Sequence, residues 1–337
     1  MTDKKDLLLD IKNLSVQFNT DSGIVKAVKH LNLSLERGKA LGFVGETGAG
    51  KTTTALAILQ LIQSPPGEIT SGEILYNGQD VRKMTEAEKR RVRGGEIAMI
   101  FQDPMTSLNP IMTVEEQIME MVSLHSHLKG SEARERAHEM LRLVGIRPER
   151  AGDYPHQFSG GMRQRVGIAI ALACKPQLLI ADEPTTALDV TIQAQVLELI
   201  KELQSKVRTS MLLITHDLGI VAETCDDVAI MYAGHLVEYA DINSLYNHPM
   251  HPYTQGLFNA VPDLESPLGG KLAVIPGLPP DPTNLPSGCS FSPRCPYAQP
   301  ICHERACGMH EIEPGHFVDC HFPLGRASGA QTSEEAK

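Results

Sequence analysis

The segment most obviously suited to chemistry is a glycine-rich run that ends in Lys and Thr. It reads GETGAGKT over residues 45–52 and fits the pattern G-x-x-x-x-G-K-[ST], between a predicted strand and a predicted helix. Glycines allow the backbone to wrap closely, so that successive N–H groups point at phosphates, and the helix start adds its positive dipole end. Lys51 would reach the β- and γ-phosphates of a nucleotide, and the Thr52 hydroxyl would ligate Mg²⁺. The residues expected to bind the nucleotide here are Gly45, Glu46, Thr47, Gly48, Ala49, Gly50, Lys51, Thr52 and Thr53.

Two carboxylates follow a second apolar strand, in the segment LLIADEP at 178–184. Asp182 stands at the end of that strand, and ligands of open parallel sheets bind beyond the carboxyl ends of the strands. An Asp in this place would hold Mg²⁺ in the second sphere or through water. Glu183 is the next residue and points to the other side of the strand end, where it can polarise an attacking water. The alternative for Glu183 is an ordinary surface carboxylate.

Four further motifs occur in a fixed order: IFQD at 100–103, FSGGMRQR at 158–165, TTALD at 185–189 and LLITHD at 212–217. They resemble the Q-loop, the signature, the D-loop and the His switch of ATP-binding subunits of ABC transporters. Together with the glycine-rich loop and the two carboxylates, the resemblance extends from residue 7 to about residue 250. It implies that the chain binds and hydrolyses ATP.

The signature departs from the family at two positions, since Phe158 and Met162 stand where Leu and Gln are usual. Ser159, Gly160 and Gly161 between them are intact. The resemblance implies that these three residues grip the γ-phosphate of an ATP bound to a partner subunit. A Ser-Gly-Gly ahead of a helix is in any case suited to an anion, or to capping the helix.

The resemblance also assigns roles to single residues of the other motifs. Gln102 would sense Mg²⁺ and the attacking water and link the core to the helical segment, and His216 would hold the γ-phosphate and orient the water. Asp189 would cross the interface between two subunits. Phe18 is the candidate for stacking on the adenine ring, unless it is a core residue. Since one chain cannot complete such a site, the chain is expected to work as a dimer whose opening and closing move membrane partners.

The C-terminal part is rich in cysteine: five of the seven cysteines lie between residues 289 and 320. No C-x₂-C pair occurs there, so the spacing is not that of a zinc ribbon. Inside a cell, clustered cysteines more often hold a metal than form disulfides. The sequence leaves open an iron–sulfur cluster, zinc, and free or oxidised thiols, and four nearby histidines are alternative ligands: His303, His310, His316 and His321.

Together with HPYT at 251–254, this tail resembles the peptide-importer branch of the ABC family. The resemblance implies a [4Fe–4S] cluster and leaves Cys307 as the spare thiol. The four implied ligands are Cys289, Cys295, Cys302 and Cys320. Whether such a cluster would be redox-active or structural is left open.

Hydrophobic patterns predict the elements that must position these motifs. Residues 7–18 and 24–35 alternate as strands with one solvated face, and alternating strands and helices elsewhere predict a parallel sheet covered by helices. The fold class is thus α/β: a P-loop NTPase core of ABC type with antiparallel β and helical subdomains, plus a small Cys-rich C-terminal extension. That extension lacks periodicity, so we expect something other than an apolar core to hold it. The expected divisions are a nucleotide-binding domain at 1–255 (helical subdomain about 105–175), the extension at 256–325, and a disordered tail at 326–337.

Composition and charge narrow the function. Thirty-one basic and 41 acidic residues give a net charge of −10, which argues against nucleic acid as the main partner. The sequence contains no apolar run of about 18 residues, and its start, MTDKKDLLLD, does not resemble a signal peptide. We therefore expect a peripheral protein on the cytoplasmic face of the inner or plasma membrane.

The function that best fits these features is that of the ATPase subunit that energises di- or oligopeptide import by an ABC transporter. The expected partners are a second ABC ATPase in a heterodimer, two transmembrane permease subunits and an extracytoplasmic solute-binding protein. An importer of nickel or another small solute is the alternative. A soluble non-transport ABC ATPase is remote, because only one phosphate-binding loop is present, and intact Lys51, Asp182, Glu183 and His216 argue against an inactive paralogue. The sequence does not name the solute, nor say whether the partner ATPase is identical.

Overall fold

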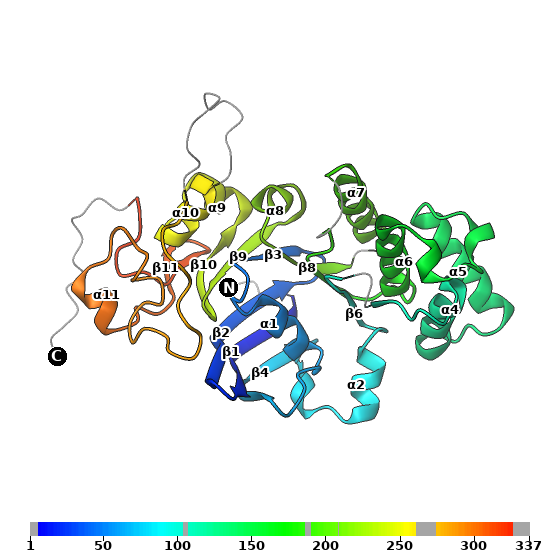
Figure 1. Cartoon of the computed structure of the whole chain (residues 1–337), viewed down its shortest axis with the longest axis horizontal. Coiled ribbons are helices and arrows are strands. Elements are labelled where there is room, and N and C mark those ends of the chain that lie inside the picture. Colours follow the sequence, from blue (N-terminus) through cyan, green and yellow to red (C-terminus); the bar gives the residue numbers. More distant parts are fainter. Residues whose placement is uncertain (1–5, 104–106, 186–189, 208, 261–273, 326–337) are drawn as a thin grey trace.

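The computed structural model describes residues 6–103, 107–185, 190–207, 209–260 and 274–325. Figure 1 shows a central sheet flanked by a helical segment on one side and by the C-terminal extension on the other, with a smaller sheet packed below. The tail expected at 326–337 lies outside the described residues. Among the helices of the described ranges, none has the length and apolar character needed to cross a membrane.

The central sheet has eight strands in the order β11-β12-β10-β9-β3-β8-β7-β6. The five strands from β9 to β6 are parallel, which confirms the predicted parallel sheet. Every residue of β3, β7 and β8 is buried, as expected for parallel strands covered on both faces. These strands are β3 (Ala40–Val44), β6 (Ile97–Ile100), β7 (Leu178–Asp182), β8 (Ser210–Thr215) and β9 (Asp227–Tyr232).

A hairpin ends this series of strands. Strand β10 (His235–Asp241) pairs antiparallel with β9 across Ala233 and Gly234. Both turn residues have positive φ, 46° and 82°, as a tight two-residue hairpin turn requires.

A second, four-stranded sheet has the order β2-β1-β4-β5 and is antiparallel. Its strands are β1 (Leu7–Thr20), β2 (Gly23–Glu36), β4 (Gly67–Tyr76) and β5 (Gln79–Asp80). The apolar face of β1 and β2 shares one core with α1 (Lys51–Ile58) and with one face of the central sheet, through residues such as Leu41 and Phe43. Strand β4 is not predicted by the sequence, because irregular register leaves it without a clean alternation of buried and exposed residues.

Helices occupy the segment in which the sequence predicts a helical subdomain. Helices α4 (Val114–His125), α5 (Ser131–Leu143) and α6 (Gly160–Leu172) pack on one another, and α6 also packs on β6. Thr113 and Glu116 form a capping box that fixes the start of α4. The remaining helices of the core are α2 (Glu86–Val92), α7 (Val190–Val207) and α8 (Leu218–Thr224).

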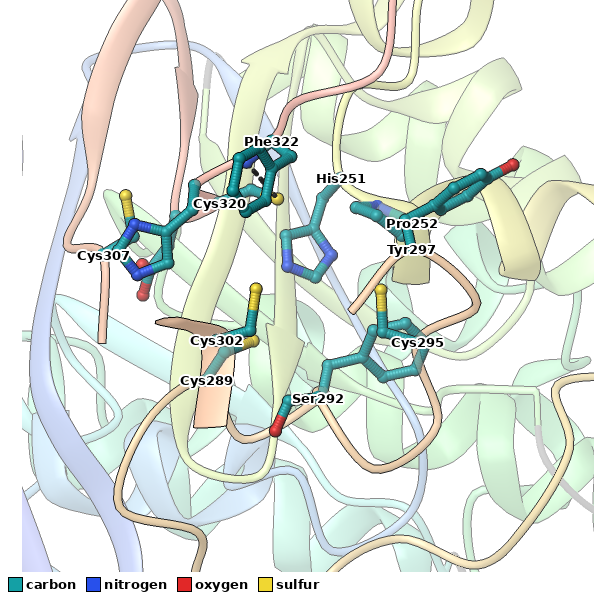
Figure 2. Close-up of a pocket in the computed structure, with 13 residues that line it drawn as sticks. His251, Pro252, Cys289, Ser292, Cys295, Tyr297, Cys302, Cys307, Cys320 and Phe322 are labelled. Atoms are coloured by element: carbon teal, nitrogen blue, oxygen red, sulfur yellow. Dashed lines mark hydrogen bonds between the residues drawn. The ribbon is translucent and has the colours of Figure 1, made fainter. Parts of the chain in front are cut away.

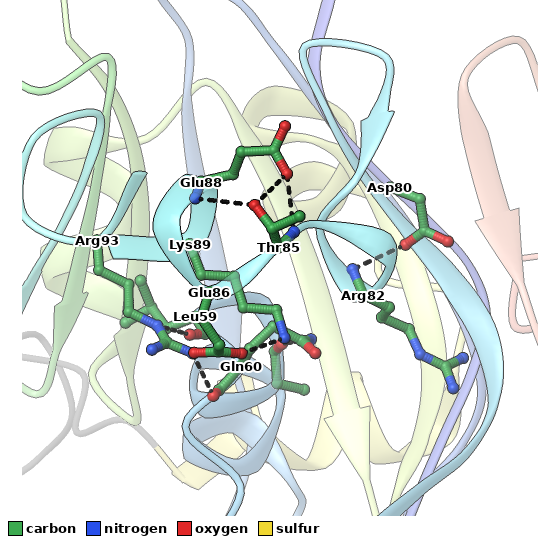
Figure 3. Close-up of polar contacts among 10 residues, drawn as sticks. Leu59, Gln60, Asp80, Arg82, Thr85, Glu86, Glu88, Lys89 and Arg93 are labelled. Carbon is green, nitrogen blue, oxygen red and sulfur yellow. Dashed lines mark hydrogen bonds and ion pairs between the residues drawn. The ribbon is translucent and has the colours of Figure 1, made fainter. Parts of the chain in front are cut away.

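Helix α1 is anchored at its C-terminal end by an arginine that follows α2. Arg93 donates from Nε to Leu59 O at 2.7 Å and from Nη2 to Gln60 O at 2.7 Å (Figure 3). The last carbonyls of a helix have no partner within the helix, so these bonds supply one. Because the phosphate-binding loop leads into α1, this anchor also fixes the helix on which the loop rests.

The C-terminal extension is more regular than the sequence predicts. Strand β12 (His316–Val318) pairs with β10 and with β11 (His310–Glu313), so the extension continues the central sheet. Phe291 lies in the main apolar core, so apolar packing contributes to holding the segment, which the sequence did not predict. Helices α9 (Ile242–Asn247) and α10 (Pro252–Ala260) lead into the extension, which contains α11 (Pro300–Glu304).

A buried polar cluster reinforces this attachment. The Glu238 carboxylate on β10 is fully buried and lies 2.7 Å from Nε2 of His316 on β12. It also accepts hydrogen bonds from the backbone N–H groups of Met250 at 2.7 Å and His251 at 2.9 Å. Since an unpaired buried carboxylate is costly, these partners make the docking of the extension specific.

Candidate functional site

The glycine-rich loop leaves the carboxyl end of β3 and enters α1 at Lys51. A Cβ on Gly45 would lie 2.2 Å from Met231 O, and one on Gly50 would lie 2.3 Å from Ala27 O. Gly50, the residue before α1, also has φ 102°. The loop is therefore pressed against β9 and β2 at two points that only glycine allows.

Lys51 lies across the inner side of this loop. Its Nζ donates hydrogen bonds to Gly45 O at 2.6 Å and to Glu46 O at 3.0 Å, and the residue is only 5% exposed. Burial lowers the pKa of Lys51, while the carboxylates of Glu183, Asp182 and Glu46 act in the opposite direction. The Lys51 ammonium group is therefore poorly solvated, so an anionic phosphate bound beside it would stabilise its charged form.

Thr52 and Asp182 meet beside the loop. Asp182, at the end of β7, is 2% exposed, and burial raises its pKa, while a hydrogen bond from the Thr52 hydroxyl works against that rise. Its Oδ1 has no hydrogen-bond partner. A buried carboxylate oxygen needs a donor or a cation, and Mg²⁺ prefers carboxylate and hydroxyl oxygens. The pair therefore fits the predicted Mg²⁺ site.

Glu183 is held between residues from two neighbouring strands. Gln102, just after β6, donates from Nε2 to Glu183 Oε2 at 2.7 Å. His216, just after β8, has Nδ1 3.4 Å from Glu183 Oε1. Glu183 itself has φ 44°, and its N–H donates to Ile214 O at 2.8 Å. Three residues predicted separately thus converge at the carboxyl ends of β6, β7 and β8.

The signature residues lie elsewhere in the chain. Ser159 caps α6, its hydroxyl accepting a hydrogen bond from Met162 N at 3.4 Å, and Ser159 and Gly160 are exposed. Figure 1 places α6 beside α4 and α5, away from α1. The structure therefore does not bring these residues to the glycine-rich loop of the same chain, as a site shared between two subunits requires.

The structure does not test the roles predicted for Phe18 and Asp189. Phe18 lies on β1, half-buried, with part of its ring packed against the core, so its stacking on adenine stays a prediction. Asp189 lies outside the described residues.

Tyr253 has no role predicted from the sequence, although it belongs to the HPYT motif. Its hydroxyl accepts a hydrogen bond from the backbone N–H of Glu46 at 3.1 Å, so α10 contacts the glycine-rich loop. Arg294 from the extension contacts the same residue, Glu46, through its side chain. The HPYT motif could have indicated Tyr253 from the sequence, whereas no motif or residue spacing indicated Arg294.

All five cysteines of the extension line one pocket, together with His251 and Phe291. Figure 2 shows the thiols of Cys289, Cys295, Cys302 and Cys320 around the His251 ring, with Cys307 to one side. The Nε2 atom of buried His251 has no hydrogen-bond partner. The chain's seven cysteines all lie in the described ranges, and each is a free thiol.

Partial burial disfavours the thiolate form of Cys289, Cys307 and Cys320. Burial raises the pKa of Cys289 to about 11 and that of Cys320 to about 12, and the other thiols contribute to both shifts. The pKa of Cys307 is also raised to about 11, by burial, then by Asp319 and Cys302. Within the described ranges, no group of three or more Cys, His, Asp or Glu side chains is already arranged to hold a metal ion. The alternative ligand His316 is engaged by Glu238.

Comparisons with known proteins agree with this geometry. The ABC transporter family matches residues 28–186, and the oligopeptide/dipeptide transporter C-terminal region matches residues 237–302. The oligopeptide transport ATP-binding protein OppD of Bacillus subtilis is 52% identical and covers 92% of this chain and 87% of the relative. The dipeptide transport ATP-binding protein DppD of Escherichia coli is 47% identical over 95% of this chain and 98% of the relative.

Solved structures extend the agreement to the fold. The dimeric structure of MJ0796, a bacterial ABC transporter cassette, is 27% identical, with a TM-score of 0.63 over 69% of this chain and 98% of that chain. The central sheet, the antiparallel sheet and the helical segment are thus those of an ABC ATPase cassette. The chain belongs to the ABC transporter family of ATP-binding proteins and carries the C-terminal region of the oligopeptide and dipeptide transporters.

Proposed function

We propose that this chain is the ATP-hydrolysing subunit that energises import of di- or oligopeptides by an ABC transporter. The observation that carries the proposal is the convergence of the Lys51 loop with Asp182, Glu183, Gln102 and His216 at one edge of the parallel sheet. This set holds the groups needed to bind a triphosphate and to position a water next to it. The names of the relatives support peptides as the solute.

Some of these residues would bind the nucleotide, and others would take part in proton transfer. Lys51 exchanges its contacts with the carbonyls of Gly45 and Glu46 for contacts with phosphate oxygens, and the loop N–H groups bind the rest. Thr52 and Asp182 would hold Mg²⁺, which when bound neutralises charge that develops on the phosphates. Gln102 also belongs to this metal site in our proposal.

Glu183 is the proposed general base. Gln102 and His216 each contact one of its two carboxylate oxygens, so the carboxylate is held in one orientation before a substrate arrives. In that orientation it accepts the proton of the attacking water, and His216 contacts the γ-phosphate and orients the water.

Ser159, Gly160 and Gly161 complete the site of a partner subunit, and Asp189 crosses the interface. The exposed start of α6 and its distance from α1 support a shared site. We propose a heterodimer with a second ABC ATPase, two transmembrane permeases and an extracytoplasmic solute-binding protein. The chain would lie on the cytoplasmic face of the membrane, where ATP is available.

For the cysteine pocket we propose one [4Fe–4S] cluster on Cys289, Cys295, Cys302 and Cys320. Four thiols that line one pocket, one of them buried and three partly buried, support it, because a bound cation would stabilise the thiolates of Cys289 and Cys320 that burial now disfavours. The peripheral place of Cys307 agrees with its exclusion from the ligand set. A bound cluster would cross-link loops that carry few apolar residues.

The proposed function is tested by reconstitution with the permeases and binding protein in proteoliposomes. Uptake of a labelled di- or oligopeptide that depends on ATP supports it. Uptake of Ni²⁺ in place of any peptide would assign the chain to the alternative importer. ATP hydrolysis with neither uptake would refute the transport role.

A further inference from the structure

We propose that Arg294 of the C-terminal extension is a positioning residue for the phosphate-binding loop and thereby sets the affinity for ATP. This inference rests on the proposed function of the loop. The two residues concerned, Arg294 and Glu46, are 248 positions apart in the chain.

The contact is a two-pronged ion pair. Nη1 of Arg294 lies 3.0 Å from Glu46 Oε2, and Nη2 lies 3.2 Å from Glu46 Oε1. A guanidinium fork that meets both oxygens of a carboxylate fixes direction as well as distance. The side chain of Arg294 is 7% exposed and that of Glu46 is 27% exposed, so solvent screens the pair less than a surface pair.

Arg294 is itself held by groups from two segments. Its Nε donates to Pro276 O at 3.0 Å, Nη2 to Ile275 O at 3.4 Å, and Nη1 to the Tyr232 hydroxyl at 3.2 Å. The guanidinium carbon also lies 5.7 Å from the centre of the Tyr232 ring. With these partners the guanidinium has one orientation available, and that orientation faces Glu46.

Glu46 connects this ion pair to the backbone of the phosphate-binding loop. It is the second residue of the loop, its backbone N–H is bound by Tyr253, and its carbonyl accepts the 3.0 Å hydrogen bond from Lys51. Fixing the Glu46 side chain therefore fixes the peptide unit against which Lys51 rests. The N–H groups that would bind the phosphates belong to the same short loop.

The position of Arg294 next to Cys295 ties the loop to the cysteine pocket. Cys295 lines the pocket, and the backbone N–H of Arg294 donates to Phe291 O at 2.9 Å within the same turn. Order in that turn determines where the guanidinium lies. The extension thus contacts the phosphate-binding loop through Arg294, although its sequence is remote from the ATP motifs.

The test measures binding of a fluorescent ATP analogue to the full-length chain with Mg²⁺. We expect R294M and E46Q each to weaken binding about tenfold, as loss of a charge-assisted pair would. The double variant R294M/E46Q should be no weaker than either single variant, because both remove the same contact. R294K should recover part of the affinity, since it keeps the charge without the fork.

Two controls separate positioning from damage to the fold. R305M removes an exposed arginine of the same extension and should bind within twofold of the wild type. In the assembled transporter, R294M should raise KM for ATP while kcat at saturating ATP stays within twofold, a split that general unfolding would not give.

Wild-type affinity in R294M, or effects of R294M and E46Q that multiply in the double variant, would overturn the inference. K51A, measured alongside, distinguishes the positioning role from the function of the loop. If K51A weakens binding and R294M does not, the positioning role alone fails. If K51A also binds as the wild type, the loop is not the nucleotide site and the proposed function fails with it.

Discussion

Gln102 and Glu183 are joined by a 2.7 Å hydrogen bond from the amide Nε2 to the carboxylate Oε2, although 81 positions separate them in the chain. The bond exists because β6 and β7 are neighbours in a parallel sheet and both residues follow the ends of these strands. His216, from the next strand, lies beside the other carboxylate oxygen. Because Gln102 directly precedes the segment that leads into the helices, movement of those helices would change how Glu183 is held.

The start of α6 offers a test of the shared site. A Cβ at Gly160 would meet no atom within 4 Å, so Gly160→Asp should fold normally. Its negative charge would stand where the partner's γ-phosphate must bind. We expect the isolated variant to bind ATP normally, while its ATP-driven dimerisation with the partner ATPase, measured by light scattering, is lost together with transport.

Gly152→Asp is the matched control, because Gly152 is also exposed and a Cβ added there would have no atom within 4 Å. It should dimerise as the wild type does. If Gly160→Asp forms the ATP-bound dimer normally, our proposal that this segment binds the partner's ATP is wrong.

The loop glycines can be tested by stability. Gly50→Ala places a Cβ against Ala27 O, whereas Gly48→Ala meets no atom within 4 Å, and both positions have positive φ. The free energy of unfolding should fall by roughly 1 kcal/mol in both variants, because positive φ is unfavourable for alanine. In Gly50→Ala it should fall by about 2 kcal/mol more, because of the contact with Ala27 O. Urea unfolding measures the difference, and equal losses would show that the close approach to β2 is relieved without cost.

The cysteine pocket makes a chemical prediction. Protein purified without oxygen should be brown and contain about four irons per chain. Cys295→Ser should bleach it and expose the extension to proteases, while ATP binding at the loop weakens without being abolished, because Arg294 adjoins Cys295. Iron analysis and limited proteolysis check both effects.

Cys307→Ser is the matched control for that experiment and should keep its iron. Loss of metal from this variant would show that the ligand set is wrong. Colourless anaerobic protein with one zinc per chain would instead favour the zinc alternative.

The residues of the proposed nucleotide site converge because each motif follows a buried strand, and the carboxyl ends of parallel strands meet at one edge. Motifs that follow strands predicted Lys51, Asp182 and Glu183, the family resemblance predicted His216, and the roles of all four stay predictions. The contact from Gln102 to Glu183 follows from the same rule, since Gln102 also follows a strand.

The structure of the C-terminal extension could not be predicted from the sequence, for a physical reason. Strand β12 is three residues long and too short to show a period, and it is stabilised by pairing with β10 and by the buried contact of His316 with Glu238. The pairing of Arg294 with Glu46 depends on the course of the whole extension across the loop. No local pattern of residues encodes such a contact.

The central claim is that ATP hydrolysed at Glu183 drives peptide import, and the most direct measurement is ATP hydrolysis together with labelled peptide uptake by the reconstituted transporter carrying Glu183→Gln. We expect ATP binding to persist while both turnover and uptake fall by about 10²-fold or more, the effect of losing a positioned base. Glu198→Gln, an exposed carboxylate on α7, is the matched control and should keep both activities. Hydrolysis and uptake at the wild-type rate in Glu183→Gln would contradict the account.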